Sequence, residues 1–199
     1  NYYIGEIKDG KPNGKGKEYN KDDILIYEGD FIDGLYDGIG LFYIEEKYEY
    51  YYGNFKNGKF NGKGILYHKL KEQINLRKNT VKNIEFYALK NEEIMKKRFN
   101  NEFVIENKKE KFYHFDVILI YEGDFINDES TGKGKLYDSE ENILYEGYII
   151  NGIPNGYGKI YKEGILKYEG YFKNNGLIGK CKNYENNRYL IGQYIIGNC

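Results

Sequence analysis

Residues 27–43, YEGDFIDGLYDGIGLFY, contain a spacing of aromatic residues and glycines that decides the fold. Counted from Tyr27 as position 0, aromatic residues occupy positions 0 and 4, glycines occupy positions 2, 7, 11 and 13, and a tyrosine occupies position 16. The same spacing starts again at Tyr3, Tyr51, Tyr121, Tyr145 and Tyr168, and a shortened copy starts at Leu190. A repeat of this period indicates an array in which each copy is one supersecondary unit.

Each copy has the residue pattern of a β-hairpin. Positions 0 to 4 alternate between aromatic or glycine residues and polar residues, which is the period of a β-strand. Asn, Asp, Gly and Pro cluster at positions 6 to 11, as in GKPNG at 10–14 and GIPNG at 152–156, and such clusters mark turns. A second short strand follows at positions 11 to 16. The chain is therefore predicted to be all-β, with one hairpin per copy.

Charges predict how the two strands of a hairpin align. Suppose that residues whose positions sum to 15 face each other. An acidic residue then meets a lysine in Glu122–Lys135, Glu146–Lys159, Glu169–Lys182, Glu6–Lys15 and Asp124–Lys133, and Tyr148 meets Tyr157. Opposite charges across an antiparallel pair contribute roughly 0.2–1 kcal/mol. We therefore expect this register, with the charged pairs on one face of each hairpin.

The other face is expected to combine aromatic rings with glycines. In this register Gly29 lies opposite Gly40, and the aromatic residue at position 4 lies opposite the glycine at position 11. A glycine inside a strand leaves room for the close approach of another group. We expect a ring of the same or the next hairpin to fill each slot, with Phe31 over Gly38 as an example. Such packing would let a single sheet be stable without a second layer.

These spacings resemble the MORN repeat (membrane occupation and recognition nexus), whose pattern is close to Y-x-G-x-F-x-x-G-x-x-x-G-x-G. Six copies match, over residues 3–67 and 121–189, although Asp128 and Asn175 replace the glycine at position 7 and Cys181 replaces the glycine at position 13. The resemblance implies an elongated single-layer antiparallel sheet of consecutive hairpins. One such array is expected to occupy residues 1–199.

Residues 68–120 interrupt the array, and no glycine occurs between Gly64 and Gly123. Two interpretations are open: an insertion, or two degenerate repeats, since the 70 residues from Tyr51 to Tyr121 are close to three repeat lengths. KFYHFDVILI before Tyr121 resembles KEYNKDDILI before Tyr27. We therefore expect the sheet to continue through residues 112–120, with 103–106 as partner strand, and residues 91–99 to form a short helix.

The sequence offers little chemistry for catalysis. Ser130 and Ser139 are its serines, and neither lies in a nucleophile-elbow pattern. Two His and two Cys at wide spacing form no metal signature, and Cys181 in a glycine position is typical of a small packed residue. We expect no enzyme activity and no cofactor. Two cysteines without a disulfide framework favour an intracellular compartment.

Charge excludes one class of partner and suggests another. The net charge of −1 gives no attraction to nucleic acid, so no nucleic-acid partner is expected. The main local excess is a basic run that suits an anionic phospholipid or an acidic partner: Lys96, Lys97, Arg98, Lys108, Lys109 and Lys111. The alternative interpretation of this run is a solvated surface.

The favoured function is a non-catalytic protein-interaction scaffold. It would bind a partner helix or an extended peptide across the aromatic face, or self-associate as a homodimer. The residues expected on that face are Tyr27, Phe31, Tyr51, Phe55, Tyr121, Phe125, Tyr145, Tyr168 and Phe172. The resemblance implies a cytoplasmic protein, peripheral to a membrane or the cytoskeleton. The alternatives are a phosphoinositide- or phospholipid-binding module, and the regulatory region of a larger enzyme such as a lipid kinase or methyltransferase.

Overall fold

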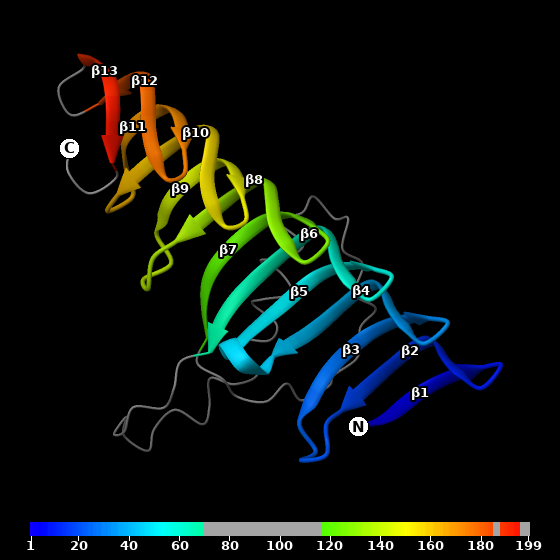
Figure 1. Ribbon diagram of the computed structural model, residues 1–199. Coiled ribbons are helices and arrows are strands. Elements are labelled where there is room, and N and C mark those ends of the chain that lie inside the picture. The colour runs from blue at the N-terminus through cyan, green and yellow to red at the C-terminus, as the bar shows by residue number, and fades with distance from the viewer. Residues whose placement is uncertain (70–116, 185–187, 196–199) are drawn as a thin grey trace, which may run out of the picture. The chain divides into compact units, whose positions relative to one another are not determined.

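The strands of the chain form one open sheet. The computed structural model describes residues 1–69, 117–184 and 188–195. In this part of the chain every strand pairs with the next strand in sequence, and the sheet has 13 strands (Figure 1). The strands are β1 (Tyr2–Lys8), β2 (Lys11–Tyr19), β3 (Leu25–Ile32), β4 (Leu35–Ile44), β5 (Glu49–Lys56), β6 (Lys59–Lys69), β7 (Val117–Ile126), β8 (Glu129–Tyr137), β9 (Ile143–Ile150), β10 (Ile153–Lys162), β11 (Ile165–Lys173), β12 (Gly176–Asn183) and β13 (Arg188–Ile195). A short 3-10 helix, Glu45–Lys47, joins β4 to β5.

The predicted all-β array of hairpins is confirmed. Each of the six copies forms one antiparallel hairpin, from β1–β2 to β11–β12, and the six hairpin turns lie along one side of the sheet (Figure 1). The turns hold two residues with positive φ, as at Asp33 (50°) and Gly34 (86°). Two successive residues with positive φ between paired strands are typical of a type I′ turn, whose twist matches the right-handed twist of the two strands. The turn residues at positions 6 and 7 therefore set the hairpin as predicted.

The predicted register holds in one half of each hairpin and is wrong in the other. Next to the open end, Glu28 pairs with Leu41 and Gly29 pairs with Gly40, as expected. The register then shifts, and Phe31 pairs with Tyr36 in place of Gly38. The shift is a β-bulge, in which extra residues on one strand oppose fewer on the other. Gly38, with φ 64°, lies in that bulge and faces Phe55 of the next hairpin instead.

The predicted charged pairs form at the open ends of the hairpins and are lost at the bulge. Three predicted pairs are confirmed as cross-strand partners: Glu122–Lys135, Glu146–Lys159 and Glu169–Lys182. The other two fall at the bulge, where a carboxylate accepts a hydrogen bond from the lysine's backbone N–H. These bonds join Lys15 to Glu6 at 3.1 Å and Lys133 to Asp124 at 2.9 Å.

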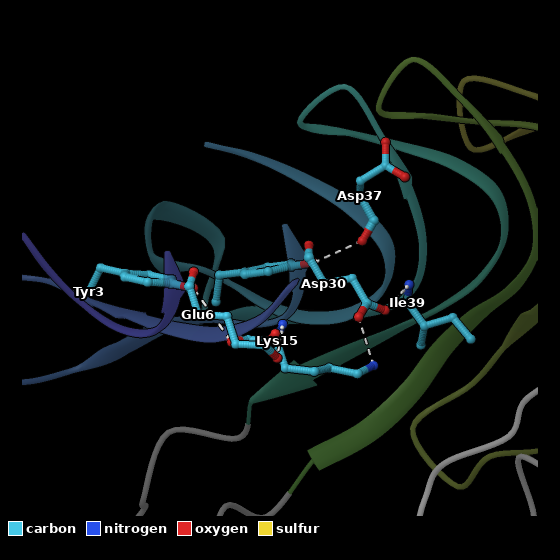
Figure 2. Close-up of polar contacts among 7 residues, drawn as sticks. Tyr3, Glu6, Lys15, Asp30, Asp37 and Ile39 are labelled. Carbon is cyan, nitrogen blue, oxygen red and sulfur yellow. Dashed lines mark hydrogen bonds and ion pairs between the residues drawn. The ribbon is translucent and has the colours of Figure 1, made fainter. Parts of the chain in front are cut away.

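Two lysines at position 12 reach a carboxylate of the next hairpin. Lys15 Nζ lies 2.7 Å from a carboxylate oxygen of Asp30, and Figure 2 draws this ion pair. Lys63 forms the equivalent ion pair with Asp124. Tyr148 and Tyr157 do not form the predicted cross-strand pair, because the register of β9 against β10 shifts between Pro154 and Gly158. On their other sides they pair with Lys133 and Tyr171 of the neighbouring hairpins. The charges thus join neighbouring hairpins as well as the strands of one hairpin.

Asp124→Ala tests the contribution of the position-3 carboxylate. The substitution removes the acceptor for the Lys133 N–H and the ion pair with Lys63, so we expect a loss of about 1–2 kcal/mol in the free energy of unfolding. Asp124→Asn keeps a side-chain oxygen that can accept the Lys133 N–H bond, and is expected to cost less than half as much. Urea denaturation measures both, and equal losses in the two variants would contradict this role.

One hydrogen bond recurs at every junction between hairpins. The backbone N–H at position 7 donates to the carbonyl at position 9 of the preceding hairpin. The five bonds are Gly34 to Pro12, Gly58 to Tyr36, Asp128 to Phe60, Gly152 to Ser130 and Asn175 to Pro154, at 2.8–3.1 Å. The junction of β6 with β7 belongs to this set, although 47 residues of sequence separate the two strands.

Strands β6 and β7 are direct neighbours in the sheet. Gly64 pairs with Gly123 and His68 pairs with Ile118, so no strand separates the third hairpin from the fourth. Residues 117–120 continue the sheet as expected and pair with β6, whereas the expected partner strand, 103–106, lies outside the described residues. Both interpretations of residues 68–120, an insertion or two degenerate repeats, stay predictions. Residues 70–116, which include the expected helix at 91–99, lie outside the described residues.

Candidate interaction surface

The tyrosine at position 0 lies flat over a pair of glycines in its own hairpin. In the second repeat the two glycines are Gly29 and Gly40, which face each other across β3 and β4. A Cβ atom on either glycine would overlap the ring of Tyr27. The glycines therefore leave the slot that the sequence predicted, but the ring that fills it comes from position 0. Phe31 at position 4 lies opposite Gly14 of the preceding hairpin.

A hydroxyl hydrogen bond holds each of these rings in place. The tyrosine hydroxyl donates to the backbone carbonyl at position 3, where the bulge begins (Figure 2). The five bonds are Tyr3 to Glu6, Tyr27 to Asp30, Tyr51 to Asn54, Tyr121 to Asp124 and Tyr145 to Tyr148, at 2.8–2.9 Å. Burial raises the pKa of Tyr145 to about 12 and raises the pKa of Tyr27 still further. These hydroxyls therefore stay protonated donors at neutral pH.

Rings of neighbouring hairpins interlock. The ring of Tyr27 meets Phe31 of its own hairpin and Phe55 of the next hairpin edge-on, each with centroids 5.0 Å apart. Tyr36, at position 9, stacks on the other side of Tyr27 at 3.9 Å. Edge-on and offset stacked rings each contribute about 0.5–1.5 kcal/mol beyond burial. The result is a continuous core along the aromatic face of a single sheet.

The nine residues expected to contact a partner all lie in or against this core. Eight of them are 0–3% exposed, and Tyr168 is partly buried against them. They hold the hairpins together and present little surface of their own. Their contact with a partner stays a prediction.

Sequence reasoning missed the side chains that do reach the surface of the aromatic face. These are partly buried residues at positions 9 and 15, packed on the core: Tyr36, Phe42, Phe60, Leu66, Leu136 and Ile160. We call this set the apolar row. Its signal was present in the sequence, because position 15 is apolar in the second to fifth repeats but is Glu18 in the first and Asn183 in the sixth.

The sixth hairpin departs from the others at one glycine position. Cys181 replaces the second glycine and is buried, and its Cβ occupies the space over Gly170. The expectation of a small packed residue is confirmed. Tyr168 is partly buried, whereas the tyrosines at this position in repeats two to five are at most 3% exposed.

The opposite face of the sheet, here called the polar face, carries hydrogen-bonded charged side chains in the fourth to sixth hairpins, whereas Ile65 of the third hairpin is buried there. Along the open ends of the hairpins, position-16 tyrosines donate to position-1 glutamates: Tyr137 to Glu122, Tyr161 to Glu146 and Tyr184 to Glu169. Hydrogen bonds from Tyr184 and Tyr157 lower the pKa of Glu169. The carboxylate is therefore ionised at neutral pH and alternates with lysines along the face.

The remaining predictions concern the basic run, metal binding and membrane-spanning segments. The basic run Lys96, Lys97, Arg98, Lys108, Lys109 and Lys111 lies outside the described residues, so phospholipid binding there stays a prediction. In the described ranges no group of three His, Cys, Asp or Glu side chains is placed to hold a metal ion. The same ranges contain no helix long and apolar enough to cross a membrane.

The repeat geometry agrees with one known family. The model of the MORN repeat matches residues 3–23, 27–44, 51–68, 121–140 and 145–164, which are the first five hairpins of the sheet. The chain is a MORN repeat protein. MORN repeats are generally interaction or membrane-associated modules, and the repeat itself is a non-enzymatic unit. The sixth hairpin lies outside the matched segments and carries the Cys181 substitution. A search of curated proteins found no match.

Proposed function

We propose that this MORN array is a protein-interaction scaffold that binds an amphipathic helix across its apolar row. The supporting observation is the row itself, in which partly exposed apolar side chains lie over a core already filled by the repeat tyrosines. A partner that docks there buries apolar surface without disturbing that core. The row ends at Glu18 on one side and Asn183 on the other, so the binding surface belongs to the second to fifth hairpins.

Spacing favours a helix that lies across the strands. Successive position-15 side chains come from β4, β6, β8 and β10, and each is two strands from the next. Two strand spacings amount to about 9.6 Å. Seven residues of α-helix rise about 10.5 Å, so one apolar residue per heptad meets one hairpin. Four hairpins then match a helix of roughly 20 residues, with small adjustments for the twist of the sheet.

The experiment selects ligands from a displayed library of helix-forming peptides. We expect enrichment of peptides whose apolar residues recur at i, i+3 or i+4, and i+7. The variant Phe42→Ser/Leu136→Ser removes two side chains of the row and is expected to weaken the selected peptides at least tenfold. The matched control is Ile32→Ser/Leu35→Ser, which changes two exposed apolar residues at a hairpin turn.

The outcome separates a row-directed site from other surfaces. Equal binding to the wild type and the Phe42→Ser/Leu136→Ser variant, with circular dichroism of both unchanged, would exclude the apolar row as the docking site. Enrichment of peptides without apolar periodicity would exclude a helix as the ligand.

A further inference from the structure

The charged ladder of the polar face is interrupted in the fifth and sixth hairpins. Positions 3 and 12 carry pairs such as Asp30 with Lys15 and Asp124 with Lys63 in the earlier repeats. In the fifth and sixth repeats these positions carry tyrosines on three successive strands, β9, β10 and β11: Tyr148, Tyr157 and Tyr171. This face does not contain the apolar row or its core.

These tyrosines belong to a larger exposed patch. Ile150 follows Tyr148 on the same side of β9, since side chains two residues apart in a strand share a face. Ile153 pairs with Ile150 across the turn, and Tyr157 meets Tyr171 with ring centroids 5.3 Å apart. The five side chains are 42–59% exposed. We call these five residues the tyrosine patch.

The size of the tyrosine patch exceeds that of scattered surface residues. An aromatic side chain presents roughly 200 Å², so five large side chains at about half exposure leave on the order of 400–500 Å² open to solvent. A dimer that covers this patch on both copies would bury roughly 1,000 Å² of patch surface in total, which is where specific interfaces begin. The area is therefore sufficient for a weak dimer.

The neighbouring charges are complementary to themselves. Beside the patch, four partly exposed side chains of alternating sign cross β9 to β12: Glu146, Lys159, Glu169 and Lys182. They are the last four of a longer row that begins with Glu122 and Lys135 on β7 and β8. Consider a two-fold axis that relates two copies of the chain and runs parallel to β10 and β11, midway between them. It places β10 of one copy against β11 of the other, and β9 against β12. Glu146 then faces Lys182 of the second copy, and Lys159 faces Glu169. The same axis places Tyr157 against Tyr171.

We propose that the tyrosine patch binds a second copy of this chain, face to face, about that two-fold axis. Charge complementarity selects this occupant, because an even row of alternating charges meets its own reversed copy without a like-charge contact. The apolar row on the opposite face stays open for a partner. The proposal therefore does not depend on the proposed helix-binding function.

Sedimentation equilibrium of the full chain tests the proposal. The wild type is expected to rise from the monomer mass of 23.5 kDa toward twice that value as its concentration approaches roughly 100 µM. The variant Tyr157→Ser/Tyr171→Ser is expected to weaken the dimer at least tenfold. Ile32→Ser/Leu35→Ser alters two residues of similar exposure at another hairpin and is expected to leave it unchanged.

Cross-linking checks the predicted symmetry in the background Cys199→Ser. Tyr157→Cys mixed with Tyr171→Cys is expected to form an inter-chain disulfide at least tenfold faster than Tyr157→Cys mixed with Ile32→Cys. A monomer mass at all concentrations would overturn the proposal. So would a dimer that persists in Tyr157→Ser/Tyr171→Ser but is lost in Ile32→Ser/Leu35→Ser.

Discussion

Gly53→Ala is expected to lower the free energy of unfolding by about 3 kcal/mol, because its methyl group has no space to occupy. A Cβ on Gly53 would lie 2.5 Å from the Cα of Gly64, 2.5 Å from the hydroxyl oxygen of Tyr51 and 2.6 Å from the carbonyl oxygen of Lys63. Two of these three atoms belong to the backbone of the paired strand. They can move only if β5 and β6 separate, so the strain is not relieved by a side-chain rotation.

The control for this prediction is Gly10→Ala. Gly10 has a φ of 75° and no atom within 4 Å of an added Cβ, so its substitution adds backbone strain without a collision. We expect a loss of about 1 kcal/mol there. Urea denaturation followed by circular dichroism compares the two variants, and amide hydrogen exchange locates the weakened strands. A loss for Gly53→Ala no larger than that for Gly10→Ala would contradict the close packing of ring on glycine.

Tyr51→Ala is expected to lower the free energy of unfolding by about 3–5 kcal/mol. Its ring is fully buried, stacks on Phe60 at 3.8 Å and meets Phe125 of the next hairpin edge-on. The substitution leaves a cavity over the glycine pair and loosens the contact between β6 and β7. Hydrogen exchange is therefore expected to rise in both the third and the fourth hairpins.

Two further variants separate the contributions of the Tyr51 hydroxyl and of its ring to the free energy of unfolding. Tyr51→Phe keeps the ring and removes the hydroxyl bond to the Asn54 carbonyl, so we expect a loss of about 1 kcal/mol. Tyr168→Ala changes the same position of the sixth repeat, where the tyrosine is partly buried. It is expected to cost less than half as much as Tyr51→Ala. Thermal denaturation orders the three variants, and similar losses at Tyr51 and Tyr168 would show that the glycine pair contributes nothing.

Sequence alone predicted the hairpins because the information is local. Two turn residues with positive φ, such as Asp33 and Gly34, determine where the chain reverses. The alternation of positions 0 to 4 then decides which side chains share a face. Charge pairs such as Glu146 with Lys159 located the register at the open end of each hairpin, where no bulge intervenes.

The bulge was not predictable from the same information. A glycine inside a strand is compatible with an extended backbone or with positive φ, and the spacing of Gly38 permits either. Its φ of 64° is stabilised by the carboxylate of Asp30, which lies 3.4 Å from the Ile39 amide nitrogen, and by Phe55 of the next hairpin opposite Gly38. Since Phe55 belongs to the neighbouring hairpin, one repeat alone does not specify this choice.

The candidate interaction surface was also predicted only in part from the sequence. The sequence identified the aromatic face but assigned partner contact to its largest residues. Tyr27 and Phe55 are buried because each ring fills a slot or an edge supplied by another strand. Leu66 and Leu136 carry no aromatic signal, yet they reach the surface because their position lies above that core.

By itself, the spacing of tyrosine and glycine determined the all-β class, the hairpin per repeat and the family. Only the tertiary structure decided which ring lies over which glycines, which acid meets which lysine at the bulge, and which apolar side chains a partner can reach. The physical reason is that a single-layer sheet has no second layer to bury its rings. Each hairpin buries them against its neighbours, and those contacts exist only when the hairpins are side by side.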